Sequence, residues 1–283
     1  MSLDSERVLA AQGRSFHLAS RLLPAQARAD AALLYHFCRL VDDLADEADD
    51  AVQARANLDL LLRELDGDSP RPLVAAVLAM AERTGMDLGA ARELIAGVLS
   101  DLDEVRVADD RELLRYCYRV AATVGVMMCP VLGVREAVAM PFAIDLGIGM
   151  QLTNICRDVK EDAELGRRYL PAARGADVQR VTGELLQLAD QYYESGERGL
   201  HFIPLRCRMA IAVAARVYRA IGRRLLRRGG DPMQGRTVVP VWEKLWNAVV
   251  ALVLLPTHRA APHEARLHHH LSDLPGTNPC PTG

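Results

Sequence analysis

The strongest constraint on this chain comes from the stretch 147–171, where oxygen-bearing side chains recur every fourth residue. Asn154, Asp158 and Asp162 would lie one above another on a single face of an α-helix. Apolar residues surround them, and Asn is a poor helix former, so a purely solvated helix face would not require this arrangement. The spacing therefore predicts one long helix that presents an amide oxygen and two carboxylates in a column.

A second acidic column lies near the N-terminus. Asp42 and Asp46 are also four residues apart, and Asp43 stands beside them. Either pair alone would usually decorate a solvated helix face. Two such helices facing each other would instead create a polar site inside an apolar bundle. Mg²⁺ prefers oxygen ligands that it shares with phosphate and water. The two columns predict a metal site for a diphosphate, with the ligands Asp42, Asp43, Asp46, Asn154, Asp158 and Asp162.

Composition narrows the fold and the functional class. The chain has 283 residues, of which half are hydrophobic and only 5% are aromatic. Abundant Ala and Leu favour helices over a β-rich fold. A net charge of −3 gives no electrostatic footprint for nucleic acid. The cysteines lie mostly in apolar segments without CxxC spacing, which indicates reduced core thiols. Residues 1–14 lack the apolar core of a secretory signal, so a cytoplasmic protein is expected.

Several polar residues near the two columns could each play one of two roles. Arg39 precedes Asp43 by one helical turn and would either pair with it or hold diphosphate oxygens as a bidentate cation. Arg157 would either balance the acidic column or screen a diphosphate. Gln151 could bond a phosphate oxygen or a metal-bound water. Ser15 could reach a phosphate, although an ordinary surface role is favoured on sequence alone.

Ordered segments of the chain resemble the squalene/phytoene synthase family. VDDLADE, QLTNICRDVKED and GRRYLP are similar to its two aspartate-rich motifs. SFHLASRLLP, YCYRVAATVG, RVYRAI and GRTVVP also fit, and the matches run in order from about Ser15 to Trp242. The resemblance implies an all-α, single-domain bundle of the class I isoprenoid synthase type with a central apolar cavity.

The resemblance also implies roles for individual residues. The two acidic columns would hold the metal, with Asp42, Asp46, Asp158 and Asp162 essential to catalysis. Tyr169 lies in a loop that caps the site, and Tyr218 matches a position near the catalytic cavity. The residues expected to bind substrate are Ser15, Tyr35, Arg39, Tyr116, Gln151, Arg157 and Arg236.

The implied reaction joins two prenyl diphosphates head to head through a cyclopropyl diphosphate. Two geranylgeranyl diphosphates giving phytoene is the first choice, with Mg²⁺, or Mn²⁺ in its place. The alternative is the bacterial squalene branch, which uses farnesyl diphosphate; only this alternative would bring in NADPH. A third reading is a non-catalytic scaffold of the same fold, but such a protein would be expected to lose its acidic columns.

Five parts of the chain carry structural expectations. The synthase domain is expected over residues 1–257, and residues 258–283 are expected to form a disordered tail. The block 51–102 is interpreted as scaffold without chemistry. Small residues including Ala122 would either allow close helix packing or line a tunnel. Leu245–Leu255, with Trp242 and Trp246, is too short to span a bilayer. It would either touch a membrane surface or be buried in the bundle, and the oligomeric state stays open.

Overall fold

The computed structural model describes residues 5, 20–255 and 262–277, and within them it contains helices and no strand. The all-α prediction is confirmed. The longer helices are α3 (Ala25–Asp46), α4 (Ala51–Leu65), α5 (Pro72–Thr84), α6 (Leu88–Ser100), α7 (Asp110–Cys117), α8 (Thr123–Val131), α9 (Met140–Glu164), α10 (Val178–Arg198), α11 (Leu205–Arg227) and α12 (Val241–Leu254). A π-helical turn, Tyr118–Ala122, joins α7 to α8.

Aspartate side chains begin several of these helices. Asp50, Asp109 and Asp177 each accept a hydrogen bond from the backbone N–H three residues later. A cap of this kind satisfies a helix N–H that otherwise has no partner and favours the positive end of the helix dipole. Local sequence therefore determines where α4, α7 and α10 begin.

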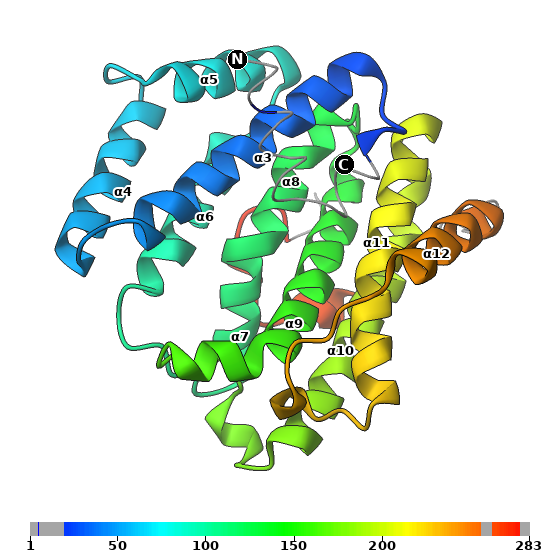
Figure 1. Ribbon diagram of the computed structural model, residues 1–283. Coiled ribbons are helices and arrows are strands. Elements are labelled where there is room, and N and C mark those ends of the chain that lie inside the picture. Colours follow the sequence, from blue (N-terminus) through cyan, green and yellow to red (C-terminus); the bar gives the residue numbers. More distant parts are fainter. Residues whose placement is uncertain (1–4, 6–19, 256–261, 278–283) are drawn as a thin grey trace.

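Helix α9 forms the centre of the bundle. It lies among α8, α10 and α11, while α3 to α6 cover one side and α12 lies outside α11 (Figure 1). Its residues Ile148 and Leu152 are fully buried. By length and composition, the segment Ala137–Glu164 could cross a membrane, but 61% of its most apolar window is buried inside the bundle. A core helix passes the same test.

Two glycine contacts bring the π-turn and α8 unusually close to α9. A Cβ on Gly147 would lie 2.5 Å from the Cα of Ala122, and a Cβ on Gly125 would lie 2.7 Å from the carbonyl oxygen of Ala143. Only glycine fits such approaches. Ala122 is therefore buried against α9 and is absent from the cavity lining. The small residue at this position serves close packing, and its methyl group does not narrow the cavity.

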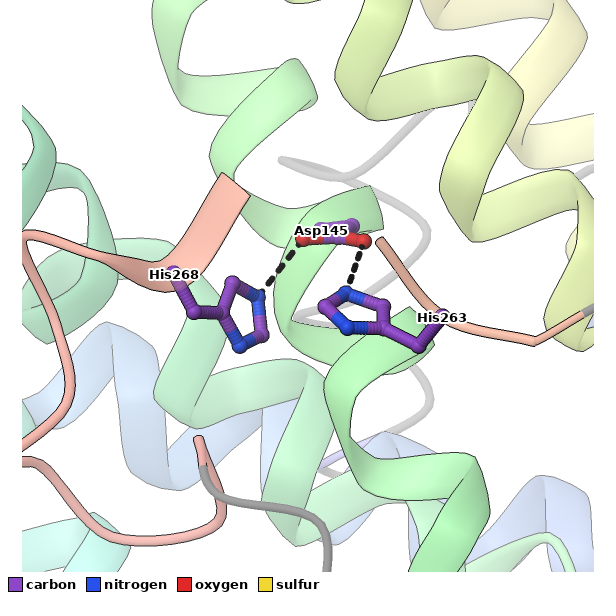
Figure 2. Close-up of side chains that lie close together, drawn as sticks. All are labelled: Asp145, His263 and His268. Atoms are coloured by element: carbon purple, nitrogen blue, oxygen red, sulfur yellow. Dashed lines mark hydrogen bonds and ion pairs between the residues drawn. The ribbon is translucent and has the colours of Figure 1, made fainter. Parts of the chain in front are cut away.

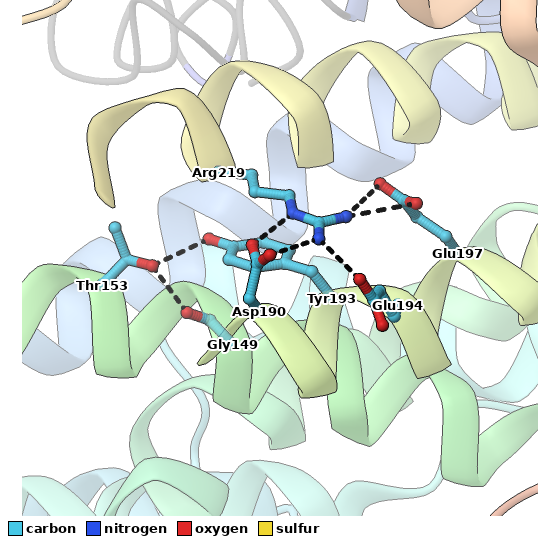
Figure 3. Close-up of polar contacts among 7 residues, drawn as sticks. All are labelled: Gly149, Thr153, Asp190, Tyr193, Glu194, Glu197 and Arg219. Atoms are coloured by element: carbon cyan, nitrogen blue, oxygen red, sulfur yellow. Dashed lines mark hydrogen bonds and ion pairs between the residues drawn. The ribbon is translucent and has the colours of Figure 1, made fainter. Parts of the chain in front are cut away.

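A buried cation fastens α10 to α11. The Arg219 guanidinium is bonded by both oxygens of Asp190, at 2.5 and 2.6 Å, and by Glu194 at 3.1 Å (Figure 3). It also lies 5.9 Å from the ring centre of Tyr193. The Tyr193 hydroxyl in turn meets that of Thr153 on α9 at 3.1 Å. This network connects α9, α10 and α11 and restrains rotation of α11 about its axis. Tyr218 is the residue before Arg219, so its position depends on the same network.

The C-terminal segment 262–277 packs onto the bundle, so the expectation of a disordered tail is wrong for these residues. Asp145 of α9 is fully buried, and each of its carboxylate oxygens accepts a hydrogen bond from an imidazole. His263 Nε2 lies 2.8 Å from one oxygen and His268 Nε2 lies 2.7 Å from the other (Figure 2). A polar, Pro-rich composition had suggested disorder, but these long-range pairs outweigh it.

Further contacts hold the same segment in place. The Tyr192 hydroxyl donates to the Leu267 carbonyl at 2.8 Å, and the Tyr118 hydroxyl donates to the Pro275 carbonyl at 2.7 Å. Leu271 is fully buried. Residues 262–277 thus belong to the same folded unit as the helices, whereas 258–261 and 278–283 lie outside the described residues.

Candidate active site

A cavity of about 410 Å³ runs between α3, α8, α9 and α11. Its lining is mostly aliphatic, but a few polar side chains gather on α3, α9 and α11: Tyr35, Asp42, Gln151, Asn154 and Tyr218. Two of the predicted metal ligands, one from each acidic column, thus line one cavity. The space accommodates a molecule that is polar at one end and hydrocarbon at the other.

The two neighbouring aspartates of α3 differ in their surroundings: Asp43 pairs closely with a cation, and Asp42 lines the cavity. Arg39 Nη2 lies 2.5 Å from Asp43, which is the simple ion pair that the helical spacing allowed. Asp42 lies 4.0 Å from Arg39 Nη1 and lines the cavity. Burial, together with the negative charges of Asp46 and Asp43, raises the pKa of Asp42 from 3.8 to about 6 despite the nearby Arg39. A carboxylate in this condition is stabilised by an added cation.

The α9 column forms as the spacing predicted, because Asn154, Asp158 and Asp162 all lie within one continuous helix. Asp158 is paired with Arg157, whose Nε donates at 2.7 Å, and with Arg236, whose Nε lies 3.1 Å away. Burial and the neighbouring Asp158 raise the pKa of Asp162 from 3.8 to about 6. In this column the charge of Asp158 is therefore neutralised by arginines, whereas the charge of Asp162 is not balanced in this way.

Asn154 supplies the sharpest sign of a cation site. Its side-chain nitrogen donates to Gln151 at 3.2 Å, which leaves the side-chain oxygen turned away from that partner. The oxygen is buried and accepts no hydrogen bond from the described residues. Buried polar atoms are normally bonded, so an unbonded one requires an explanation. An amide oxygen that shares the cavity with Asp42 and the helix face with Asp162 fits the oxygen-rich donor set that Mg²⁺ requires.

Asp101 was missed by the sequence reasoning, which treated residues 51–102 as scaffold. It follows α6 directly and accepts hydrogen bonds from the hydroxyls of Tyr116 and Tyr169, each at 2.9 Å. The two rings stack with their centres 4.8 Å apart. Burial raises the pKa of Asp101, and the charge of Asp46 adds to that effect. The scaffold interpretation of residues 51–102 did not anticipate these contacts.

Backbone pairing explains how Asp101 meets the two tyrosines. Arg168 N donates to the Val105 carbonyl at 3.0 Å, and Val107 N donates to the Arg168 carbonyl at 3.0 Å. The loop that follows α9 is thereby bound to the segment that follows α6. The sequence contains one signal for this role. A carboxylate after the C-terminus of a helix is disfavoured by the negative end of the helix dipole, so Asp101 must be stabilised by other contacts.

The remaining predicted residues fall into three groups. Tyr35, Gln151 and Tyr218 line the cavity, and burial raises the pKa of both tyrosines. Arg157 and Arg236 converge on Asp158, so they lie at the polar end of the site. Ser15 lies outside the described residues.

Comparisons with known proteins give matches over most of the chain. The sequence profile of the squalene/phytoene synthase family matches residues 9–243. A 15-cis-phytoene synthase of Enterobacter agglomerans is 35% identical over 89% of this chain and 95% of its own length. A 15-cis-phytoene synthase of a Paracoccus species is 40% identical over 81% and 83%, respectively. The solved structure of a dehydrosqualene synthase with bound ligand superposes with a TM-score of 0.82 at 27% identity, covering 90% of this chain and 96% of that one.

Proposed function

Because the chain belongs to the squalene/phytoene synthase family, and so is a prenyltransferase that acts on prenyl diphosphates, we propose that it condenses two geranylgeranyl diphosphates into phytoene. The observation that carries the proposal is that one residue from each acidic column, Asp42 and Asn154, lines the same apolar cavity. A diphosphate would lie against α3 and α9, and its hydrocarbon chain would extend between α8 and α11.

We propose that Asp42, Asp46, Asn154, Asp158 and Asp162 hold divalent metal, with Asp43 as an assisting ligand and Mg²⁺ as the first choice. The unbonded Asn154 oxygen and the raised pKa values of Asp42 and Asp162 support this assignment. Bound metal would neutralise the departing diphosphate. Arg157 and Arg236 add fixed positive charge at the same end.

The chemistry requires no side-chain nucleophile. The allylic C–O bond breaks with its electron pair leaving on the diphosphate, and the double bond of the second substrate attacks the resulting cation. Loss of a proton closes a cyclopropane, and a second ionisation followed by rearrangement and proton loss gives the product. The aliphatic lining excludes water from these cations. Tyr35 and Tyr218, with Tyr116 and Tyr169 held by Asp101, would orient the diphosphates and the second step.

A thirty-carbon product is the second candidate. The superposition on a dehydrosqualene synthase favours it specifically, because that protein shares 27% of its residues with this chain over nearly its whole length. The phytoene synthase relatives are 35% and 40% identical, which places the forty-carbon product first. Only a squalene product would require NADPH.

The test is a product assay. Purified protein would be incubated with Mg²⁺ and either geranylgeranyl or farnesyl diphosphate, with and without NADPH, and the extract identified by mass. A forty-carbon hydrocarbon formed without NADPH is expected. A thirty-carbon product, or a cyclopropyl diphosphate from farnesyl diphosphate alone, would move the protein to the squalene branch. No turnover of either substrate by folded, metal-loaded protein would favour a scaffold.

We further propose that the protein works in the cytoplasm at a membrane surface. Phytoene is a hydrocarbon with almost no solubility in water, so the enzyme must deliver it to an apolar phase. This argument rests on the insolubility of the product in water, and it does not depend on which part of the enzyme contacts the membrane.

A further inference from the structure

Helix α12 exposes an apolar stripe to solvent. Trp242 and Trp246 are 68% and 64% exposed, and Val249 and Val253 continue the line at helical spacing. Along with these four, the exposed apolar residues of this region are Val238, Val241, Leu245 and Leu254. Clustered exposure on this scale marks an interaction surface, whereas scattered apolar residues are normal.

The charges of α12 are arranged to leave this stripe without a carboxylate. Glu243, the single acidic residue of the helix, is turned inward and is bonded by Arg224 at 2.8 Å and Arg227 at 2.7 Å. Lys244 is the other charged residue of the helix. Two arginines of α11 and Lys244 thus outnumber the one carboxylate near the N-terminal end of α12, and the Arg227 side chain is 64% exposed. An apolar face with aromatic residues, next to a net positive charge, matches an interfacial helix that lies on an anionic lipid surface.

The opposite face of α12 adjoins the wall of the substrate cavity. Ala251 and Leu255 pack into a cluster that includes Ala210 and Ala214 of α11. The same two alanines line the cavity. Only α12 itself and α11 thus separate the exposed stripe from the space proposed for the hydrocarbon chain, as the position of α12 outside α11 in Figure 1 also indicates.

A second copy of the chain is the alternative occupant of this stripe, and it would have to match the stripe in shape over about 800 Å² on each partner. A bilayer needs no complementary shape, and Trp side chains favour its headgroup region.

We propose that the outer face of α12 lies flat on an anionic bilayer, with Trp242 and Trp246 inserted at the headgroup level. The proposal deepens the function proposed above, because it identifies the surface through which a lipid-handling enzyme would reach its membrane. Its test does not depend on catalysis.

The chain contains only two tryptophans, so its intrinsic fluorescence reports on this face alone. The full-length protein would be mixed with vesicles of phosphatidylcholine and phosphatidylglycerol. A blue shift of emission, quenching by brominated lipid and co-sedimentation with the vesicles are expected. A Val249→Ser, Val253→Ser double variant keeps both reporters and should bind at least tenfold more weakly.

The matched control is Val52→Ser combined with Val138→Ser, because both valines are exposed on other parts of the fold. This variant should bind vesicles as the unaltered protein does. Equal binding by all three proteins, or no spectral change with vesicles, would overturn the proposal. Blue emission without lipid, accompanied by elution as a dimer, would assign the face to a second copy. Vesicle binding without product formation would overturn the proposed function and leave the docking face intact.

Discussion

Helix α9 carries an aspartate near each end, Asp145 fully buried and Asp162 half-buried, and the surroundings shift their pKa values in opposite directions. Burial alone would raise the pKa of Asp145, but hydrogen bonds from His263 and His268 outweigh that effect and hold the pKa below its ordinary value. At Asp162, 17 residues further along and roughly 25 Å away, burial and like charges raise the pKa to about 6.

The difference shows that partners decide what a buried carboxylate does. Asp145 is satisfied by groups of the chain itself, so it stabilises the fold. Asp162 lies in a cluster of like charges with Asp158 and Asp101 nearby, so it costs stability until a cation arrives. An aspartate therefore stabilises the fold at one end of α9 and is a candidate metal ligand at the other.

The largest effect should come from Asp162→Asn. Activity should fall about a thousandfold, since several kcal/mol of transition-state stabilisation would be lost with the metal site. Metal-free protein at pH 7 should unfold at an equal or higher temperature than the unaltered protein, because one repelling charge is removed. Turnover rates and calorimetry measure the two effects. A folded variant with ordinary activity would remove Asp162 from the proposed metal site.

Asp145→Ala should lower stability and leave activity nearly unchanged. It removes the acceptor of two buried imidazoles, and we expect a loss of about 3 kcal/mol in the free energy of unfolding, or roughly 5–10 °C in melting temperature. Turnover of the folded variant at low temperature should change little. Asp273→Ala is the control, since its carboxylate is exposed and its solvent-screened ion pair with Arg115 should contribute little to stability. Equal losses in both variants would contradict the assignment.

The third expected effect is a pH dependence at the acidic end. Asp42 and Asp162 have folded pKa values of about 6 against an ordinary value of 3.8. The folded state therefore holds these protons more tightly, so their contribution to stability falls as pH rises from about 4 to 6 and stays low above that. Mg²⁺ competes with the same protons. Its apparent affinity should drop about 30-fold between pH 6 and 5, where two carboxylates protonate.

Thermal melts with and without Mg²⁺ and inorganic diphosphate, between pH 5 and 8, would measure this dependence. Asp162→Asn should lose most of the Mg²⁺-dependent shift. A metal effect on melting that is the same at pH 5 and pH 7.5 would show that these two carboxylates do not bind the ion.

The smallest effect should be that of Asp101→Asn, which keeps the shape but removes the charge that both tyrosine hydroxyls face. We expect kcat to fall about tenfold through misplacement of Tyr116 and Tyr169, without a loss of stability. Combining it with Tyr116→Phe should cost less than the sum of the two single changes, because the residues share one hydrogen bond. Additive effects would show that Asp101 acts independently of Tyr116.

Much of this architecture could be predicted from the sequence because it rests on local periodicity. The four-residue spacing of Asn154, Asp158 and Asp162 is a property of any α-helix, and α9 has it. The Arg39–Asp43 pair follows from the same geometry. Helix starts at Asp50 and Asp109 follow from side-chain capping. Such features need only neighbours within one or two turns, which the sequence specifies directly.

Contacts between residues far apart in the chain could not be predicted in this way. Asp101 meets Tyr169 across 68 residues, and Asp145 meets His268 across 123. No periodicity signals either pair, because each depends on how the loop after α9 or the C-terminal segment folds back. The sequence by itself determined the helices and the chemistry of the two columns. The tertiary structure decided which carboxylates are satisfied, which lack a partner, and which face of α12 is left exposed.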